Sequence, residues 1–356
     1  MKDLLEDYKK SKNMKMLKSV EEIGENLRLI LRLDTDLPID NGVILDNNRL
    51  RKSIPTIRFL LERNNKLVII GHRGRPIGRD LSLSLRPVYL ELMELLEGNN
   101  PGSIENIFIE DIKDEEKINS ALEENQIVFV ENIRFWEEEE KGNMELFTNL
   151  VKSCHALVND AIAVAHRQAA SIVLHREMET YYGFNFMEEV EGMKKAINGE
   201  KPITLILGGA KEDKLKYINE LSQKMDYILI GGKLPKLISL SDNQFVSDKI
   251  KIAKLRDDGL DLSDEDIDNF DEIISISNTI IWSGAMGFYE DEKSRNGTQK
   301  IATAIANSQA TFKTIAGGDT SASIKDLGLK DKINFICSGG GVLLEMLIKG
   351  DLPAWN

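Results

Sequence analysis

The feature that most constrains the fold is a repeated alternation between short apolar runs and longer amphipathic stretches. Apolar runs of strand length include residues 27–33 (LRLILRL), 66–71 (KLVIIG) and 127–132 (IVFVEN). The stretches between them space their apolar residues as helices do, and RPVYLELMELLEG (86–98) closes on a glycine. Because strands that alternate with helices need crossover connections, this order predicts βαβ units and a parallel sheet.

Further elements of the first half follow the same logic. Residues 55–65 are expected to form a helix with Pro55 in its first turn. Residues 144–154 are expected to form another helix, and a strand begins at residue 156.

The alternation pauses over residues 179–200, which form one helical stretch, and then resumes. The later apolar runs are ITLIL, YILIGG, NTIIWSG, FKTIAGG and INFICSGGG, at residues 203–207, 227–232, 278–284, 312–318 and 333–341. We therefore expect an α/β protein with two Rossmann-like parallel-sheet domains joined by a hinge helix. The expected boundaries are residues 14–180 for the first domain, 181–200 for the helix and 201–356 for the second domain, whose last residues could pack on the first.

Composition and charge exclude several classes of protein. A net charge of −13 argues against general nucleic-acid binding, which needs a basic field. No apolar run approaches the roughly 20 residues of a membrane span, and residues 1–13 read as a frayed tail without a signal core. The two cysteines, Cys154 and Cys337, lie far apart and predict neither a disulfide framework nor a metal site. We expect a soluble cytoplasmic protein, with the acidic run 257–272 forming a solvated helix face and loop.

Polar residues gather where the predicted strands of the first half end, which is where open α/β sheets bind ligands. In an acidic chain, several strand ends that carry arginine or histidine predict a concentrated cationic pocket. Guanidinium groups suit phosphate and carboxylate oxygens, so this pattern favours a small phosphorylated acid. The residues concerned are Arg32, Asp34, Asp36, Arg49, His72, Arg73, Arg75, Glu131, Asn132, Arg134, Asn159, Asp160, His166 and Arg167.

The strand ends of the second half carry glycines instead. The turns are GGAK (208–211), GG (231–232), SGAMG (283–287), AGGDT (316–320) and SGGG (338–341), and each is expected to close an apolar run and precede a helix. Glycines allow a backbone to approach a ligand closely, and helix N-termini offer unpaired N–H groups to phosphate. Together these turns predict a nucleotide site. Asp319 could hold Mg²⁺ beside phosphates or could act as a helix cap.

These motifs, in this order, resemble phosphoglycerate kinase. The matching stretches are RLDTDLPID, LDNNRL, GHRGRP, VENIRF, VNDAIAVAHR, LILGGAK, IIWSGAMGFYE, NGT, AGGDTSAS and CSGGGVLLE, from about residue 27 to residue 345. The resemblance implies two domains and reversible transfer of the acyl phosphate of 1,3-bisphosphoglycerate to ADP. The products would be 3-phosphoglycerate and ATP, Mg²⁺ would be required, and the protein would be a monomer.

The resemblance also implies roles for particular residues. Lys211 and Gly340 would stabilise the transferring phosphoryl group together with Arg49, and Asp319 would hold Mg²⁺. The residues expected to hold phosphoglycerate are Asp34, Asp36, Arg49, His72, Arg75, Arg134 and Arg167. Those expected to hold the nucleotide are Lys211, Lys214, Glu290, Gly317, Gly318, Asp319 and Thr320.

The chain departs from the family pattern mainly on the nucleotide side. Asp36 stands where the family has asparagine, and the segment between residues 233 and 280 is shorter. The second lysine, Lys214, lies three positions after Lys211, whereas the family has it four positions after. On a helix, this difference of one residue turns the direction of the side chain by about 100°. One alternative is therefore a catalytically weak or inactive kinase-like protein that binds phosphoglycerate as a regulator. A dinucleotide-dependent oxidoreductase is disfavoured, because no G-x-G-x-x-G follows a strand.

Overall fold

The computed structural model describes residues 17–240, 245 and 247–356, so the expectation for residues 1–13 lies outside the described residues. Over this part of the chain, two six-stranded sheets form, and every strand pair within them is parallel. The predicted α/β class with two parallel sheets is confirmed. A two-stranded antiparallel ribbon, β2 (Ile39–Asp40) with β3 (Val43–Ile44), is added to the first half.

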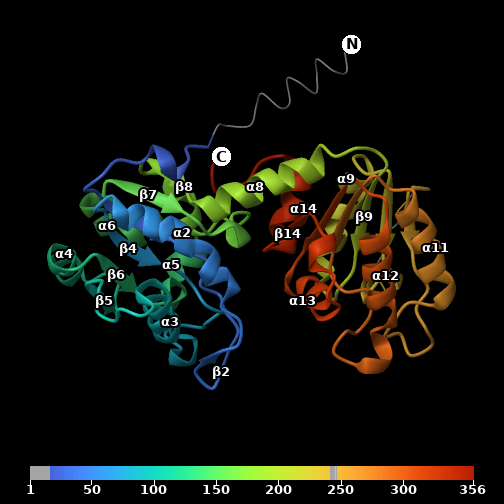
Figure 1. Ribbon diagram of the computed structural model, residues 1–356, viewed down its shortest axis with the longest axis horizontal. Coiled ribbons are helices and arrows are strands. Elements are labelled where there is room, and N and C mark those ends of the chain that lie inside the picture. The colour runs from blue at the N-terminus through green and yellow to red at the C-terminus, as the bar shows by residue number, and fades with distance from the viewer. Residues whose placement is uncertain (1–16, 241–244, 246) are drawn as a thin grey trace, which may run out of the picture. The chain divides into compact units, whose positions relative to one another are not determined.

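The first sheet has the strand order β5-β6-β4-β1-β7-β8. Figure 1 labels its strands β4 to β8. Its strands are β1 (Arg28–Arg32), β4 (Lys66–Ile70), β5 (Asn106–Ile109), β6 (Ile127–Val130), β7 (Ala156–Asn159) and β8 (Thr180–Tyr182). Its helices are α2 (Asn48–Glu62), α3 (Arg86–Glu97), α4 (Glu115–Glu124), α5 (Glu137–Glu140), α6 (Thr148–Ser153) and α7 (Ala170–Val173). Short 3₁₀ turns lie at Val20–Glu22, Leu81–Leu83, Ile133–Phe135, Met144–Phe147, Ile162–Val164 and Leu174–Arg176.

Both faces of this sheet are covered, as expected for a parallel sheet whose strands are apolar throughout. Leu29 and Leu31 point to the face that carries α2 and α3, whereas Ile30 points to the face that carries α4, α6 and α7. Right-handed crossovers explain this division, because the chain first moves along the sheet from β1 in one direction and then returns in the other. The helices that follow the neighbouring strands β1 and β7 thus lie on opposite faces. A crevice opens at such a point, and α/β proteins bind ligands there.

The second sheet has the order β11-β10-β9-β12-β13-β14. Its strands are β9 (Ile203–Leu207), β10 (Tyr227–Ile230), β11 (Ile250–Ile252), β12 (Thr279–Ser283), β13 (Phe312–Ala316) and β14 (Phe335–Cys337). Its helices are α9 (Ile218–Ser222), α10 (Leu234–Ser239), α11 (Asp264–Ser275), α12 (Asn296–Asn307), α13 (Gly318–Asp326) and α14 (Gly340–Lys349), with 3₁₀ turns at Glu212–Tyr217, Glu292–Ser294 and Lys330–Lys332.

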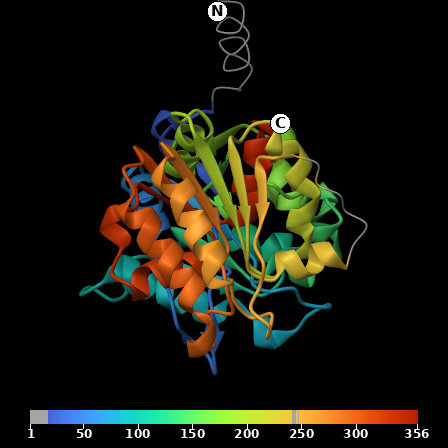
Figure 2. The ribbon, with the colours of Figure 1, turned by 90° about the vertical axis from the view of Figure 1, so that its right-hand side faces the viewer.

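The second sheet also lies between two layers of helices (Figure 2). Side chains of α11, α12 and α13 pack with the fully buried Trp282 of β12 in one apolar core. The adjacent strands β9 and β12 are again followed by helices on opposite faces, so the reversal of strand order lies between them.

The described residues divide into two compact units. One contains the chain up to Glu188 together with Asp351–Asn356, and the other contains Glu189–Gly350. Helix α8 (Phe184–Ile197) therefore begins in the first unit and ends in the second. The last residues are fixed to the first unit, because the Tyr182 hydroxyl donates to the carbonyl of Ala354 at 2.9 Å and the ring of Trp355 packs on Phe186.

Several local expectations were wrong. Helix α2 starts at Asn48, so Pro55 lies inside the helix and not in its first turn, at the cost of one backbone hydrogen bond. The helix expected directly after GGAK is a 3₁₀ turn over Glu212–Tyr217 before the short α9. Between residues 233 and 280, the described residues form α10 and β11, for which no element was expected. Helix α11 in the same segment is the helix expected in the acidic run. Among the described residues, no helix is long and apolar enough to cross a membrane.

Candidate active site

The carboxyl ends of β1, β4, β6 and β7 bring the predicted cations of the first unit together. Arg49 lies at the start of α2, and its Nη1 is 3.4 Å from both carboxylate oxygens of the buried Asp34 and 3.3 Å from the carbonyl of Asp36. Asp34 therefore fixes the guanidinium of Arg49 near the end of β1.

His72 follows β4 and lies deep in this cluster, with only 2% of its surface exposed. Its pKa is held well below its usual value, first by burial and then by the positive charges of Arg32, Arg134, Arg167 and Arg49. The ring is consequently neutral at physiological pH and can donate a hydrogen bond without adding charge.

Arg134 and Arg167 complete the cationic cluster. Burial lowers the pKa of Arg134 to about 10, and the neighbouring charge of Arg167 acts in the same direction. Arg134 donates to the carbonyl of Gly74 at 2.5 Å, whereas Nε of Arg167 is buried without a hydrogen-bond partner. A buried N–H donor without a partner suits an anionic ligand.

Asp36 introduces a carboxylate into the same region. One of its oxygens accepts from the backbone N–H of Gly74 at 2.9 Å, and the other lies 4.0 Å from Nε2 of His72. The departure from asparagine is thus accommodated, because a backbone N–H and the cations stabilise the added charge. Arg75 is exposed in the loop after β4, and its part in substrate binding stays a prediction.

The glycine turns of the second unit meet at the reversal between β9 and β12. Gly284 has a φ of +99°, and a Cβ at this position would lie 2.3 Å from the carbonyl oxygen of Gly208. The Gly284 N–H donates to the hydroxyl of Thr320 at 2.8 Å, which ties this turn to the first turn of α13. A Cβ on Gly340 would lie 2.7 Å from the hydroxyl of Ser283, so α14 begins at the same place. The N-termini of α13 and α14 thus converge here and can present N–H groups to phosphate.

Lys214 lies directly beneath these turns. Its ammonium nitrogen is 2.9 Å from the carbonyl oxygens of Gly208 and Ser283 and 3.3 Å from the Ser283 hydroxyl. Burial lowers its pKa to about 8, and the nearby charge of Lys211 acts in the same direction. The shorter spacing after Lys211 therefore places the second lysine against the backbone of the turns.

Lys211 and Asp319 are exposed near the same turns, and Glu290 is exposed in the segment after SGAMG. Asp319 lies in the first turn of α13, and its charge is close enough to act on Lys214. The described residues contain no group of three or more potential metal-binding side chains. A single carboxylate such as that of Asp319 fits Mg²⁺, which is commonly held by one or two carboxylates together with substrate phosphates and water.

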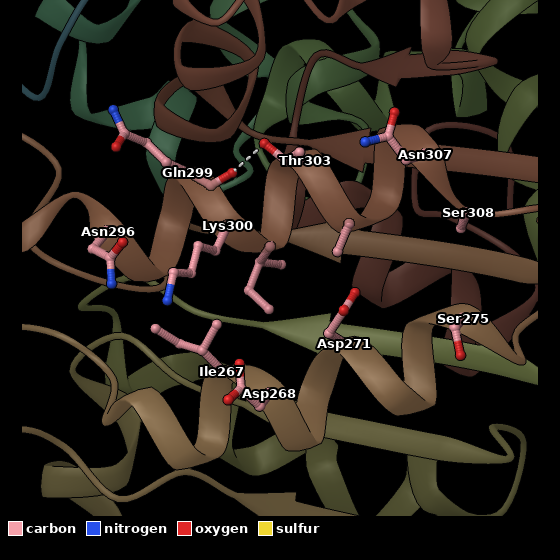
Figure 3. A pocket seen from close by; sticks show the side chains of 12 residues that line it. Ile267, Asp268, Asp271, Ser275, Asn296, Gln299, Lys300, Thr303, Asn307 and Ser308 are labelled. Carbon is pink, nitrogen blue, oxygen red and sulfur yellow. Dashed lines mark hydrogen bonds between the residues drawn. The ribbon is translucent and has the colours of Figure 1, made fainter.

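Two hollows in the described residues lie elsewhere. A groove of about 510 Å³ runs between α11 and α12, lined by Asp268, Asp271, Asn296, Lys300 and Asn307 (Figure 3). A second hollow of about 490 Å³ is lined by Lys201, Asp226 and Lys249 near the first residues of β9 and β10. Neither hollow includes the cations or the glycine turns described above.

Comparison with known proteins decides the family. A family model described as phosphoglycerate kinase matches residues 20–250 and 236–350. The phosphoglycerate kinase of Dictyoglomus turgidum is 34% identical over 92% of this chain and 94% of its own length. The chain belongs to the phosphoglycerate kinase family. The phosphoglycerate kinase of Finegoldia magna is 33% identical over 96% of the chain and 98% of its own length.

Solved phosphoglycerate kinases share the fold. The enzyme of Pyrococcus horikoshii matches with a TM-score of 0.78 and 27% identity, over 95% of this chain and 97% of its own. That of Coxiella burnetii matches with a TM-score of 0.74 at 23% identity, over 96% and 98% of the two chains. Membership of the phosphoglycerate kinase family makes this chain a phosphotransferase.

Sequence reasoning gave no role to two residues that support the cationic cluster. Glu139 and Ser171 are both buried and hydrogen-bonded to each other, and Ser171 accepts a hydrogen bond from Arg32. Glu139 lies within a run of four glutamates, and one of four identical neighbours cannot be singled out by pattern.

Proposed function

We propose that this chain catalyses reversible phosphoryl transfer between 1,3-bisphosphoglycerate and ADP, giving 3-phosphoglycerate and ATP with Mg²⁺. The observation that carries the proposal is the cationic cluster around the neutral His72, inside a chain of net charge −13. Such a cluster supplies the local positive field that an acidic protein needs for a phosphorylated acid.

The first domain, residues 14–180, would hold the phosphoglycerate. Its phosphate and carboxylate suit the donors of His72 and of the surrounding arginines, with Asp34 fixing Arg49. The complete proposed set is Asp34, Asp36, Arg49, His72, Arg75, Arg134 and Arg167.

The second domain, residues 201–356, would hold the nucleotide. Its proposed set is Lys211, Lys214, Glu290, Gly317, Gly318, Asp319 and Thr320, with Asp319 as the ligand of Mg²⁺. The metal, when bound, would neutralise phosphate charge during transfer. Lys214 would contribute positive charge from below the turns.

Chemistry would consist of positioning and charge neutralisation. The phosphorus–oxygen bond to the acyl oxygen breaks as a new bond forms to a terminal oxygen of ADP. The leaving group is a carboxylate and the attacking oxygen is already charged, so no proton is transferred. Arg49, Lys211 and the N–H groups at Gly340 would stabilise the group in flight. We propose helix α8, within the predicted boundaries 181–200, as the hinge helix that joins the two domains, in a monomer of the cytoplasm.

A coupled assay tests the activity. Purified protein with 3-phosphoglycerate and Mg-ATP should form ADP, and Lys211→Ala and Arg49→Ala should each abolish turnover. Matched controls are Lys216→Ala, on the 3₁₀ turn that follows Lys211, and Arg51→Ala, exposed on α2, which should both retain turnover. Absence of turnover in the unaltered protein, with 3-phosphoglycerate binding retained in calorimetry, would favour the regulatory alternative.

A further inference from the structure

Next to the cationic cluster, three buried polar side chains form a continuous hydrogen-bonded series that ends on His72. We name Glu139, Ser171 and Arg32 the inner relay. Each member exposes 1% of its surface or less. They come from α5, α7 and the last residue of β1. Buried polar groups in such a series are expensive unless each of them is satisfied, so their geometry is strongly fixed.

The first half of the inner relay sets the direction of one hydroxyl group. The Ser171 hydroxyl donates to Glu139 at 2.6 Å, and the Ser171 backbone N–H donates to the other carboxylate oxygen at 2.8 Å. Because a hydroxyl has one hydrogen, the Ser171 oxygen is left as an acceptor, and it accepts from Nε of Arg32 at 3.0 Å.

The second half of the inner relay sets the state of the imidazole. Arg32 donates through Nη1 to the carbonyl of Leu33 and points Nη2 at Nδ1 of His72, at 2.8 Å. A guanidinium has five N–H donors and no acceptor. Nδ1 must therefore accept, and the single hydrogen of the neutral ring must be on Nε2. Nε2 is the nitrogen that lies 4.0 Å from the carboxylate of Asp36. The charges of Arg49, Arg134 and Arg167 also act on the ring.

The alternative tautomer would work against the pocket. With hydrogen on Nδ1, two donors, that N–H and the Nη2–H of Arg32, would face each other. The lone pair of Nε2 would then face the oxygens of a bound phosphate or carboxylate. With hydrogen on Nε2, the ring donates to the anion, and the surrounding arginines supply the charge.

We propose that the inner relay consists of positioning residues that lock His72 in the Nε2–H tautomer, so that the ring donates a hydrogen bond to the anionic substrate. The inference rests on the proposed function for the identity of that anion, 3-phosphoglycerate, and on the geometry alone for the tautomer. A purely structural relay, which only ties α5 and α7 to the sheet, would leave both tautomer and substrate affinity insensitive to its loss.

The tautomer can be read directly in the whole protein by long-range ¹H–¹⁵N NMR spectroscopy. The chain has four histidines, so His72→Gln identifies the signals of His72. The expected spectrum of the free protein shows hydrogen on Nε2 and none on Nδ1. Hydrogen on Nδ1 would overturn the inference whether or not the protein turns over substrate.

Two variants then break the inner relay at different points. Ser171→Ala removes the acceptor for Arg32, and Glu139→Gln removes the charge while keeping the shape. Each should shift the His72 signals towards a mixture of tautomers and raise KM for 3-phosphoglycerate about tenfold, with kcat and KM for Mg-ATP changed less than about twofold. Glu137→Gln, an exposed neighbour on α5 that pairs with Lys141, is the matched control and should change neither.

The outcomes separate this inference from the proposed function. If the unaltered protein lacks turnover, calorimetric binding of 3-phosphoglycerate replaces KM, and weaker binding by Ser171→Ala together with the tautomer shift still supports the relay. An unchanged tautomer and unchanged affinity in either folded variant would refute it. If Ser171→Ala fails to fold, Glu139→Gln and the spectrum of the unaltered protein decide.

Discussion

The side-chain nitrogen of Lys214 lies 2.9 Å from the carbonyl oxygen of Ser283, at the end of β12. The same nitrogen lies 2.9 Å from the carbonyl of Gly208, just beyond the end of β9. Lys214 thus joins the two neighbouring strands at the reversal of the second sheet, beneath the turns proposed to hold nucleotide phosphate.

Replacing this lysine should loosen the two strand ends. Lys214→Met keeps most of the side-chain volume but removes the donor to the Gly208 carbonyl, which costs about 1–3 kcal/mol. The Ser283 carbonyl still accepts from the N–H of Gly208 at 3.0 Å. Hydrogen exchange of backbone amides at the ends of β9 and β12 should accelerate in the absence of ligands, because exchange reports local opening. Lys216→Met, on the same 3₁₀ turn but exposed, should leave these rates unchanged. Equal rates in Lys214→Met and the unaltered protein would show that the contact contributes nothing.

The lowered pKa of Lys214 predicts a dependence of stability on alkaline pH. The pKa is about 8 in the folded protein and about 10.5 in the unfolded chain. Between these values the unfolded state binds a proton that the folded state does not, so stability rises with pH across this window. The free energy of unfolding should rise from pH 8 to pH 10.5 in the unaltered protein but not in Lys214→Met. Parallel pH curves would contradict the assignment.

The lowered pKa of His72 predicts a loss of stability at acidic pH. Its folded pKa lies well below 6.5, whereas the unfolded ring titrates near 6.5. Stability from this group is therefore present above about pH 6.5 and is lost as pH falls below it, because the unfolded state then takes up a proton. Denaturant titrations at pH 7 and pH 5.5 should show a smaller loss in His72→Gln than in the unaltered protein. A loss of equal size in both would assign the acid sensitivity to other groups.

The proposed role of Asp319 as the ligand of Mg²⁺ predicts that its loss changes the magnesium dependence of the reaction. Asp319→Asn preserves the size of the side chain but removes the charge in the first turn of α13. The magnesium concentration for half-maximal rate should rise about tenfold or more, with KM for 3-phosphoglycerate unchanged. Asp331→Asn, exposed in the turn before β14, serves as the control. An unaltered magnesium curve for Asp319→Asn would remove this residue from the metal site.

The sheets and the polar strand ends could be predicted because each depends on local pattern. Apolar runs such as ITLIL indicate strands by composition, and residues that follow a parallel strand must lie at its carboxyl edge, as His72 and Arg134 do. The class of fold and the gathering of cations needed no knowledge of distant contacts.

Other features depend on contacts that sequence spacing does not encode. Pro55 suggests a helix start, but packing of Leu50 and Ile57 in the apolar core favours a longer helix that absorbs the proline. A rotation of the Lys214 side chain by about 100° requires an α-helix, whereas the chain forms a 3₁₀ turn there. Ser171 meets Arg32 across 139 residues of sequence, and no local pattern announces such a pair.

The return of residues 351–356 to the first unit has a consequence for how the protein is made. Trp355 is 2% exposed and packs against Tyr182 and Phe186, so the apolar surface that it covers stays open until it arrives. A ribosome must therefore synthesise the whole of the second unit before the first can be completed. During that interval, the nascent first unit carries an unfilled aromatic site, and chaperones that recognise exposed aromatic surface have time to act on it.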